Sequence, residues 1–302
     1  MNKNRLGQSD LYVSEIGLGC MSLGTDEAKA ISIVHEALEQ GINFIDTADL
    51  YDEGRNEEII GKAIRHRRGD VVLTTKVGNR RIPGQEGWSW DPSKSYIKAA
   101  VKDSLRRLQT DYIDLYQLHG GTIDDPIDET IEAFEELKQE GLVRYYGISS
   151  IRPNVIKEYV KRSNIVSVMS QYSILDRRPE EEILPLLKDH GISLIARGPL
   201  AGGILTEKGR SKAERKYLDY SSEELLNVHD QLMQETNNSR TLAQTALHYP
   251  LANPTVAVII PGASSLEQLK QNVSAAGTAS LSSAEIEVIQ KVSKANRYTL
   301  HL

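Results

Sequence analysis

Short apolar runs alternate with longer amphipathic segments along most of this chain. Apolar Phe44 and Ile45 form a short run that ends at Asp46. Apolar residues in the preceding segment instead recur every three or four positions, at Ile31, Val34, Ala37 and Leu38. The first pattern predicts a buried strand, and the second predicts a helix that packs one face against it. Asp26 is expected to cap this helix, and Gly41 to end it.

The same unit repeats to the end of the chain. Strands are expected at residues 16–18, 44–46, 71–76, 113–119, 143–149, 167–171, 193–197 and 256–260, and later helices from residue 56 and at 92–108, 127–140, 154–162, 180–190, 240–249 and 266–276. Strands that alternate with helices pair in parallel, and eight such units close into a barrel. The sequence therefore predicts one (β/α)8 TIM barrel domain over residues 1–302, with an N-terminal hairpin around residues 6–11 and an appended helix at 282–296.

Two predicted connections are unusually long, at residues 78–91 and 199–239. Long connections are usually lids or binding loops, or else surface segments. Trp88 and Trp90 in the first of them are candidates for an apolar substrate wall, and packing of that loop on the barrel is the alternative.

The composition is typical of a globular protein and argues against a membrane-spanning or nucleic-acid-binding one. Of the 302 residues, 39% are hydrophobic and 26% charged, and no apolar run approaches the ~20 residues of a membrane span. Lys3 and Arg5 are not followed by an apolar segment, so we expect no secretory signal and a cytoplasmic location. The single cysteine, Cys20, excludes an intrachain disulfide and a multi-thiolate metal site. The formal charge of −6 argues against nucleic acid as a partner.

Polar residues end six of the predicted strands, and in a parallel barrel such residues gather at one mouth. They are Asp46, Lys76, His119, Ser149, Gln171 and Arg197. Each has a structural explanation when taken alone: Asp46 as a helix cap, Lys76 as a strand cap, His119 as a hydrogen-bonded core residue.

Together with Tyr51, three of these residues suit proton transfer. A tyrosine can donate its phenolic proton to a developing alkoxide, but its ordinary pKa is about 10. A neighbouring Lys76 ammonium would stabilise the tyrosinate, and Asp46 would hold that ammonium charged and oriented. His119 would orient the carbonyl oxygen.

Six motifs carry a resemblance to a known family. They are DTADLY at 46–51, Gly54-x-Asn56-Glu57, LTTKVG around Lys76, SLRRLQTDYIDLYQLH ending at His119, GISS at 147–150 and IPGASSLEQLKQN at 260–272. In this order they make the chain similar to the aldo-keto reductase superfamily over nearly its whole length. The resemblance implies that Asp46, Tyr51, Lys76 and His119 form a catalytic tetrad, and that NADPH binds across the barrel mouth without a Rossmann fold. Accordingly, Gly17-x-Gly19 is an incomplete dinucleotide fingerprint.

The resemblance also implies a set of cofactor contacts. Ser149 and Gln171 match residues that hold the nicotinamide amide, and Arg197 stands where many relatives stack an aromatic ring, with a surface salt bridge as the alternative. Basic residues of the long loop are expected to reach the 2'-phosphate, unless that loop is merely solvated. The full set is Gly19, Ser149, Gln171, Arg197, Pro199, Leu200, Lys208, Arg215, Gly262, Ser264, Gln268 and Asn272.

The leading hypothesis is therefore an NADPH-dependent reductase of aldehyde or ketone carbonyls, which takes hydride from the nicotinamide and a proton from Tyr51. A second hypothesis is a nicotinamide-binding redox sensor or regulatory subunit with slow turnover, because PLAGGIL and PGASSLEQL resemble the potassium-channel β subunits of the same superfamily. A third, lyase or isomerase chemistry on the same residues, predicts no consumption of NADPH. The sequence leaves the physiological substrate and the oligomeric state open.

Overall fold

The computed structural model describes residues 1–82, 87–235 and 240–302. Eight parallel strands form one sheet in which each strand pairs with the next in the chain. The first and last are also joined, because Ile16 bridges Ile259 and Gly19 bridges Gly262 in parallel register, so the predicted barrel is confirmed. Its strands are β3 (Leu18–Gly19), β4 (Phe44–Asp46), β5 (Val72–Val77), β8 (Ile113–Leu118), β9 (Val143–Ser149), β10 (Ser167–Gln171), β11 (Ser193–Arg197) and β12 (Val256–Ile260).

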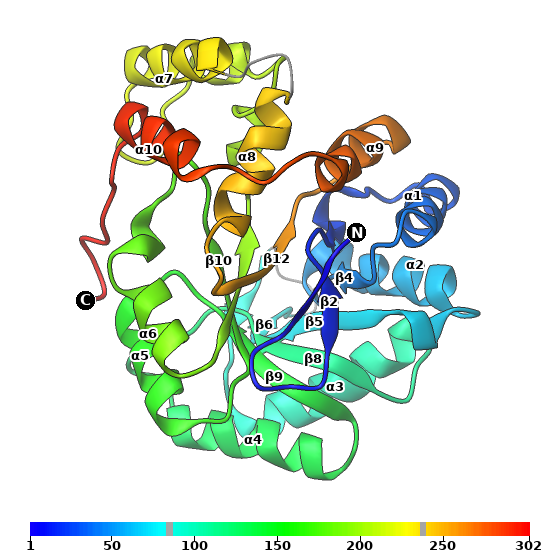
Figure 1. Cartoon of the computed structure of the whole chain (residues 1–302). Helices are drawn as coiled ribbons and strands as arrows, with labels where there is room; N and C mark the ends of the chain where they lie inside the picture. Colours follow the sequence, from blue (N-terminus) through cyan, green and yellow to red (C-terminus); the bar gives the residue numbers. More distant parts are fainter. Residues whose placement is uncertain (83–86, 236–239) are drawn as a thin grey trace.

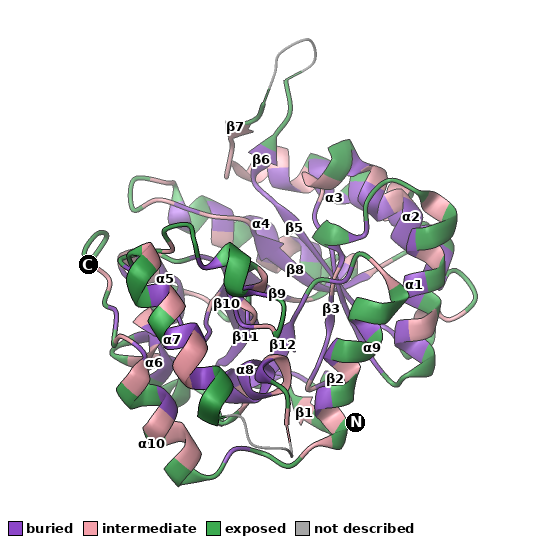
Figure 2. Ribbon diagram, turned by 90° about the horizontal axis from the view of Figure 1, so that it is seen from above, coloured by how far each residue is buried: buried purple, intermediate pink, exposed green. Residues whose placement is uncertain are grey.

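Helices surround this barrel (Figure 1), and their exposed faces point outward (Figure 2). Those that follow the strands are α1 (Glu27–Glu39), α2 (Arg55–Ile64), α3 (Lys94–Leu108), α4 (Ile127–Gln139), α5 (Pro153–Arg162), α6 (Ile183–Asp189), α8 (Leu242–Leu251) and α9 (Leu266–Ser274). The predicted cap of α1 is confirmed, since the Asp26 carboxylate accepts a hydrogen bond from the Lys29 amide. Within the described residues, none of these helices has the length and apolarity needed to cross a membrane.

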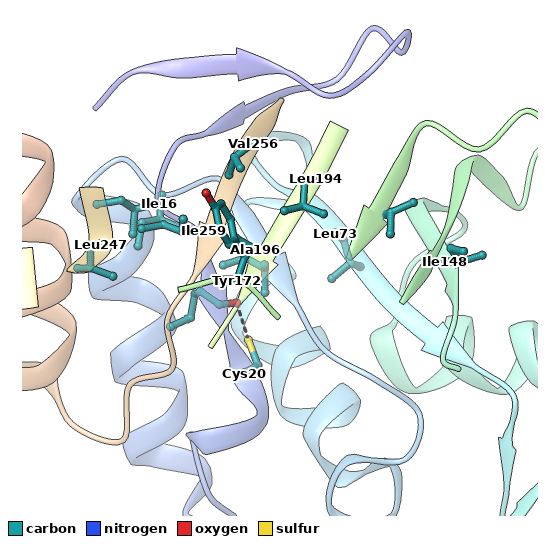
Figure 3. Packing of buried hydrophobic residues seen from close by; sticks show 14 of the residues in the cluster. Ile16, Cys20, Leu73, Ile148, Tyr172, Leu194, Ala196, Leu247, Val256 and Ile259 are labelled. Atoms are coloured by element: carbon teal, nitrogen blue, oxygen red, sulfur yellow. Dashed lines mark hydrogen bonds between the residues drawn. The ribbon is translucent and has the colours of Figure 1, made fainter. Parts of the chain in front are cut away.

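Two apolar layers hold the barrel together. The outer layer lies between strands and helices, where Leu247 of α8 packs near Ile16 and Ile259 at the junction of the first and last strands (Figure 3). The inner layer fills the barrel. It contains the buried side chains of Phe44, Val72, Leu115, Met169, Ile195 and Val258. Burial of the apolar side chains in these two layers is the main favourable contribution to folding.

The predicted N-terminal hairpin is confirmed and closes one end of the barrel. Strands β1 (Lys3–Arg5) and β2 (Tyr12–Ser14) pair antiparallel, and Leu6, Leu11 and Val13 join the inner apolar layer. The Gly7 amide donates to the hydroxyl of Ser193, the first residue of β11. The hairpin therefore covers the amino ends of the strands, and the carboxyl ends are left for ligands.

The segment at 199–239 differs from the prediction of one long connection. It contains α7 (Ser222–Glu235), whose Leu225, Val228 and Leu232 are buried, and α7 packs against the appended helix α10 (Ser283–Val292) as Figure 1 shows. A reciprocal pair of hydrogen bonds between Ser221 and Glu224 begins α7. The predicted capping box of α10 at Ser282 is confirmed. Residues 236–239 of the predicted loop lie outside the described residues.

The segment at 78–91 forms a small hairpin of β6 (Asn79–Arg80) and β7 (Ser89–Trp90) that projects from the barrel in Figure 2. Residues 83–86 of it lie outside the described residues. The ring of Trp90 lies where a side chain at Gly78 would stand, and its indole N–H donates to Asp125 at 3.0 Å. Trp90 therefore packs its loop against the barrel, as the alternative interpretation predicted. Trp88 is 56% exposed, so the predicted substrate wall stays a prediction for that residue alone.

Candidate active site

Three neighbouring strands bring the four predicted catalytic residues together. Asp46 ends β4, Lys76 lies near the end of β5, and His119 follows β8. Tyr51 begins the short 3-10 turn Tyr51–Gly54 after β4. Because β4, β5 and β8 are adjacent in the sheet, residues distant in the sequence share one corner of the barrel mouth.

The centre of this corner is a buried ion pair. The Lys76 Nζ atom donates to Asp46 Oδ2 and to the Thr47 carbonyl, each at 2.8 Å, and to Tyr51 Oη at 3.4 Å, so each ammonium proton has an acceptor. Burial disfavours the ammonium, but the charges and hydrogen bonds of Asp46 and Tyr51 outweigh it and raise the pKa of Lys76. The structural readings of Asp46 as a helix cap and of Lys76 as a strand cap are therefore wrong.

Tyr51 is a protonated acid held against this pair. Burial raises the pKa of its phenol, while the Lys76 charge acts in the opposite direction. The lowered pKa expected from Lys76 alone is therefore wrong, because desolvation of the tyrosinate is the larger effect. The phenol thus keeps its proton at neutral pH, and Lys76 limits the cost of giving it up.

His119 is a neutral imidazole beside Tyr51. The two rings meet edge to face, with centroids 6.0 Å apart. Burial, followed by the positive charges of Lys76 and Arg197, lowers the pKa of His119 to about 3. Its Nδ1 atom is buried and has no hydrogen-bond partner in the described chain, so the expectation of a fully hydrogen-bonded core histidine is wrong.

The turn that carries Tyr51 is anchored by two side chains that look like an ordinary helix start in the sequence. Asn56 accepts from the Thr47 hydroxyl at 2.7 Å and donates to the Cys20 carbonyl at 2.9 Å. Glu57 is 0% exposed; it accepts from Thr75 at 2.6 Å and from Arg107 at 2.7 Å. Sequence reasoning missed this positioning role, because polar residues are common in the first turn of any helix.

Asp49 is a further, partly buried carboxyl that the sequence did not reveal. It lies between β4 and Tyr51 and lines an open cavity of about 570 Å³ together with Tyr96, Arg107 and Asp103. Burial, with the nearby negative charge of Glu57, raises its pKa to about 8. Its Oδ1 atom is buried without a partner in the described chain.

This raised pKa gives a prediction for stability. The unfolded chain loses the Asp49 proton near its ordinary pKa, whereas the folded chain retains it up to about pH 8. This difference lowers the free energy of unfolding as the pH rises from 4 to 8. Asp49→Asn should therefore increase the free energy of unfolding by about 1–4 kcal/mol near pH 8 and by much less near pH 4. Urea unfolding at several pH values measures this difference.

The matched control is Asp103→Asn, which removes an exposed carboxylate from the same cavity wall. Its effect should be small and nearly independent of pH over this range. A constant difference between Asp49→Asn and the unaltered protein from pH 4 to 8 would contradict the assignment.

The predicted nicotinamide contacts lie on the next strands of the barrel. Ser149 ends β9, Gln171 ends β10 and Arg197 ends β11, and Gln171 is directly paired with Arg197. Pro199 and Leu200 follow in the connection after β11. The structure thus brings these residues to the same mouth as the tetrad.

The predicted adenosine contacts form a second group around the start of α9. The amide and hydroxyl of Ser264 both donate to Gln268 Oε1, at 2.8 and 2.9 Å, and Asn272 donates to the Gly262 carbonyl at 3.1 Å. Gly19 lies opposite, bridged to Gly262. A Cβ atom on Gly262 would stand 2.3 Å from Ser22 Oγ, so the Ser22 side chain would have to move to admit one.

The two predicted phosphate-binding cations, Lys208 and Arg215, are exposed. Neither side chain forms an ion pair or hydrogen bond with another residue that the structure describes. In the same segment Arg210 pairs with Asp230 at 3.1 Å, and Lys212 donates to the Gly202 carbonyl at 3.2 Å. Of these four cations, Lys208 and Arg215 are the ones without a partner inside the described chain.

Comparison with known proteins agrees with this architecture. The model of the aldo/keto reductase family matches residues 15–294. The chain is 61% identical to the uncharacterized oxidoreductase YqkF of Bacillus subtilis, over 100% of this chain and 99% of the relative. It is 32% identical to the NADH-specific methylglyoxal reductase of Escherichia coli, over 98% and 99% of the two chains. The structure also superposes on the holo form of the aldo-keto reductase AKR11C1 from Bacillus halodurans with a TM-score of 0.95 at 61% identity. The match covers 100% of this chain and 99% of the AKR11C1 chain. This chain belongs to the aldo/keto reductase family.

Proposed function

We propose that this protein reduces aldehyde or ketone carbonyls to alcohols with NADPH, and that Tyr51 supplies the proton. Aldo-keto reductases are oxidoreductases that use a nicotinamide cofactor. The observation that carries the proposal is the buried Asp46, Lys76 and Tyr51 chain beside neutral His119. Such a chain can deliver one proton to an oxygen at the barrel mouth.

The residues at the mouth fit a dinucleotide. The bare backbone at Gly262, where a Cβ atom would clash with Ser22, and the free N–H groups at the start of α9 suit phosphate and ribose groups. In this proposal Ser264, Gln268 and Asn272 hold the adenosine end, and Ser149 and Gln171 hold the nicotinamide amide. NADPH, when bound, supplies the hydride for the carbonyl carbon.

The protein's own residues would handle the carbonyl oxygen. Tyr51 Oη gives its proton to that oxygen, and the Lys76 ammonium stabilises the tyrosinate that remains. Asp46 keeps this ammonium charged and in place through the 2.8 Å ion pair. His119 is neutral near pH 7 because its pKa is about 3, and a neutral imidazole can donate a hydrogen bond without releasing a proton.

NADPH is preferred to NADH in this proposal because of the two unpaired cations, Lys208 and Arg215, which suit the 2'-phosphate. The NADH-specific relative from Escherichia coli shows that the other preference also occurs at 32% identity. Methylglyoxal, the oxoaldehyde in the name of that relative, is one member of the carbonyl class that should be assayed. The cytoplasmic location and the single-domain organisation stay predictions from the sequence.

Titration of both cofactors, followed by a carbonyl panel, tests the proposal. We expect NADPH to quench tryptophan fluorescence at a concentration at least about tenfold lower than NADH, since a charged hydrogen bond contributes about 1.5–3 kcal/mol. Lys208→Gln/Arg215→Gln should weaken NADPH binding and leave NADH binding nearly unchanged. Arg210→Gln is the control, because Arg210 is already paired with Asp230.

Equal affinity for the two cofactors would contradict the assignment of the loop cations. Kinetics then separates the enzyme from the sensor: many turnovers per molecule support a reductase, whereas very slow turnover with tight cofactor retention supports the regulatory alternative. Absence of NADPH oxidation with every carbonyl in the panel would overturn the proposed activity.

A further inference from the structure

The Arg197 guanidinium is a partly buried cation whose side chain forms no hydrogen bond or ion pair with another described residue. Other arginines with little exposure are paired: Arg68 with Asp114, Arg107 with Glu57, Arg177 with Glu180 and Arg178 with Asp176. A charge removed from water without a partner costs several kcal/mol. Such a cation at a ligand-binding mouth indicates an anion that is brought by a ligand.

Arg197 lies at the same barrel mouth as the proposed catalytic residues. It is the last residue of β11, and its charge acts on the titrations of Tyr51, Asp46 and His119. Arg197 therefore lies within electrostatic range of the proposed proton donor. Burial lowers the pKa of Arg197 itself, but a guanidinium stays protonated at neutral pH.

The carboxylates near Arg197 are already engaged. Asp46 is paired with Lys76 at 2.8 Å, and Asp176 accepts two hydrogen bonds from Arg178, each at 2.8 Å. With Tyr51 and His119 both neutral, the charges of Lys76, Arg197 and Asp46 leave the mouth with an excess of positive charge. An anionic group on the bound substrate would compensate this excess.

We propose that Arg197 binds an anionic group of the substrate, so that the preferred carbonyl compounds carry a carboxylate or a phosphate. This inference rests on the proposed reductase function. The planar guanidinium binds a carboxylate or phosphate through two parallel hydrogen bonds, which fixes where the carbonyl lies relative to Tyr51. Arg197 then determines substrate specificity. This role replaces or accompanies the contact with the cofactor that the family resemblance implies.

Matched substrate pairs test this directly on the full-length protein. We expect kcat/KM for 4-oxobutanoate to exceed that for neutral 4-oxobutanamide, or kcat/KM for glyceraldehyde 3-phosphate to exceed that for glyceraldehyde. The pair with the larger preference identifies carboxylate or phosphate as the recognised anion. Arg197→Met should reduce kcat/KM for the preferred anionic substrate at least about tenfold more than for its neutral partner, mainly through KM. Arg197→Lys should restore part of that preference.

The control is Arg81→Met, which removes an exposed arginine that pairs with Glu53 at 2.7 Å, and it should leave both preferences nearly unchanged. Equal losses for charged and neutral substrates in Arg197→Met, with a raised Kd for NADPH, would overturn the proposal and assign Arg197 to the cofactor. If the unaltered protein reduces no carbonyl compound, the proposed function fails by itself. Calorimetric titration with succinate, a dicarboxylate that cannot be reduced, then still decides the anion site, because binding that Arg197→Met abolishes supports it and no binding overturns it.

Discussion

Replacement of Tyr51 by phenylalanine should lower kcat for carbonyl reduction by about 10²–10⁴-fold, the usual contribution of a positioned general acid. The substitution removes only the phenolic oxygen. The ring can keep its edge-to-face contact with His119, and Lys76 retains its two 2.8 Å acceptors. Cofactor affinity, measured by tryptophan fluorescence, should therefore stay nearly unchanged while steady-state turnover collapses.

Tyr116→Phe is the matched control for this experiment. Its hydroxyl is fully buried in β8 and has no hydrogen-bond partner in the described chain, and its ring packs on Phe134 outside the barrel mouth. Loss of that hydroxyl should affect neither turnover nor cofactor affinity. Normal turnover in Tyr51→Phe would show that another group supplies the proton.

Lys76→Met should destabilise the protein by about 3–5 kcal/mol, because removal of one partner from a buried ion pair leaves the other charge uncompensated. Asp46 would then lie in the barrel with its carboxylate deprived of the 2.8 Å ammonium contact. Reductase activity should also be lost, since nothing would stabilise the tyrosinate. Urea unfolding at pH 7 measures the first effect, and NADPH oxidation measures the second.

The double variant Asp46→Asn/Lys76→Met separates the two effects. It removes both charges, so most of the lost stability should return, whereas the activity should not. A single Lys76→Met variant as stable as the unaltered protein would show that this pair is not an ion pair in the folded state.

Much of the fold follows from the alternation of apolar strands with amphipathic helices. The sequence alone predicts that Asp46, Lys76 and His119 share one mouth, because they stand at the ends of β4, β5 and β8 and parallel strands have a common direction. The segment at 199–239 was harder to interpret. Its glycines and basic residues are typical of a loop, and only packing against α10 reveals that the apolar residues of α7 form a buried face.

The chemistry of individual side chains was less predictable than their positions. The raised pKa of Asp49 depends on burial and on a Glu57 that is eight residues away in sequence, and no local motif contains that information. The isolation of Arg197 depends on which carboxylates its neighbours have already engaged, which is a property of the whole mouth. Trp90, likewise, was assigned to packing only by its contacts with Gly78 and Asp125.

The junction between the two ends of the barrel has a consequence for biosynthesis. Ile16 and Gly19 find their partners in Ile259 and Gly262, which the ribosome makes only after the seven other strands of the barrel. Until then the nascent chain has an unpaired strand edge that can associate with other chains. Because such long-range pairing forms slowly, the newly made chain should be most prone to aggregate in the interval before β12 is inserted between β11 and the N-terminal segment.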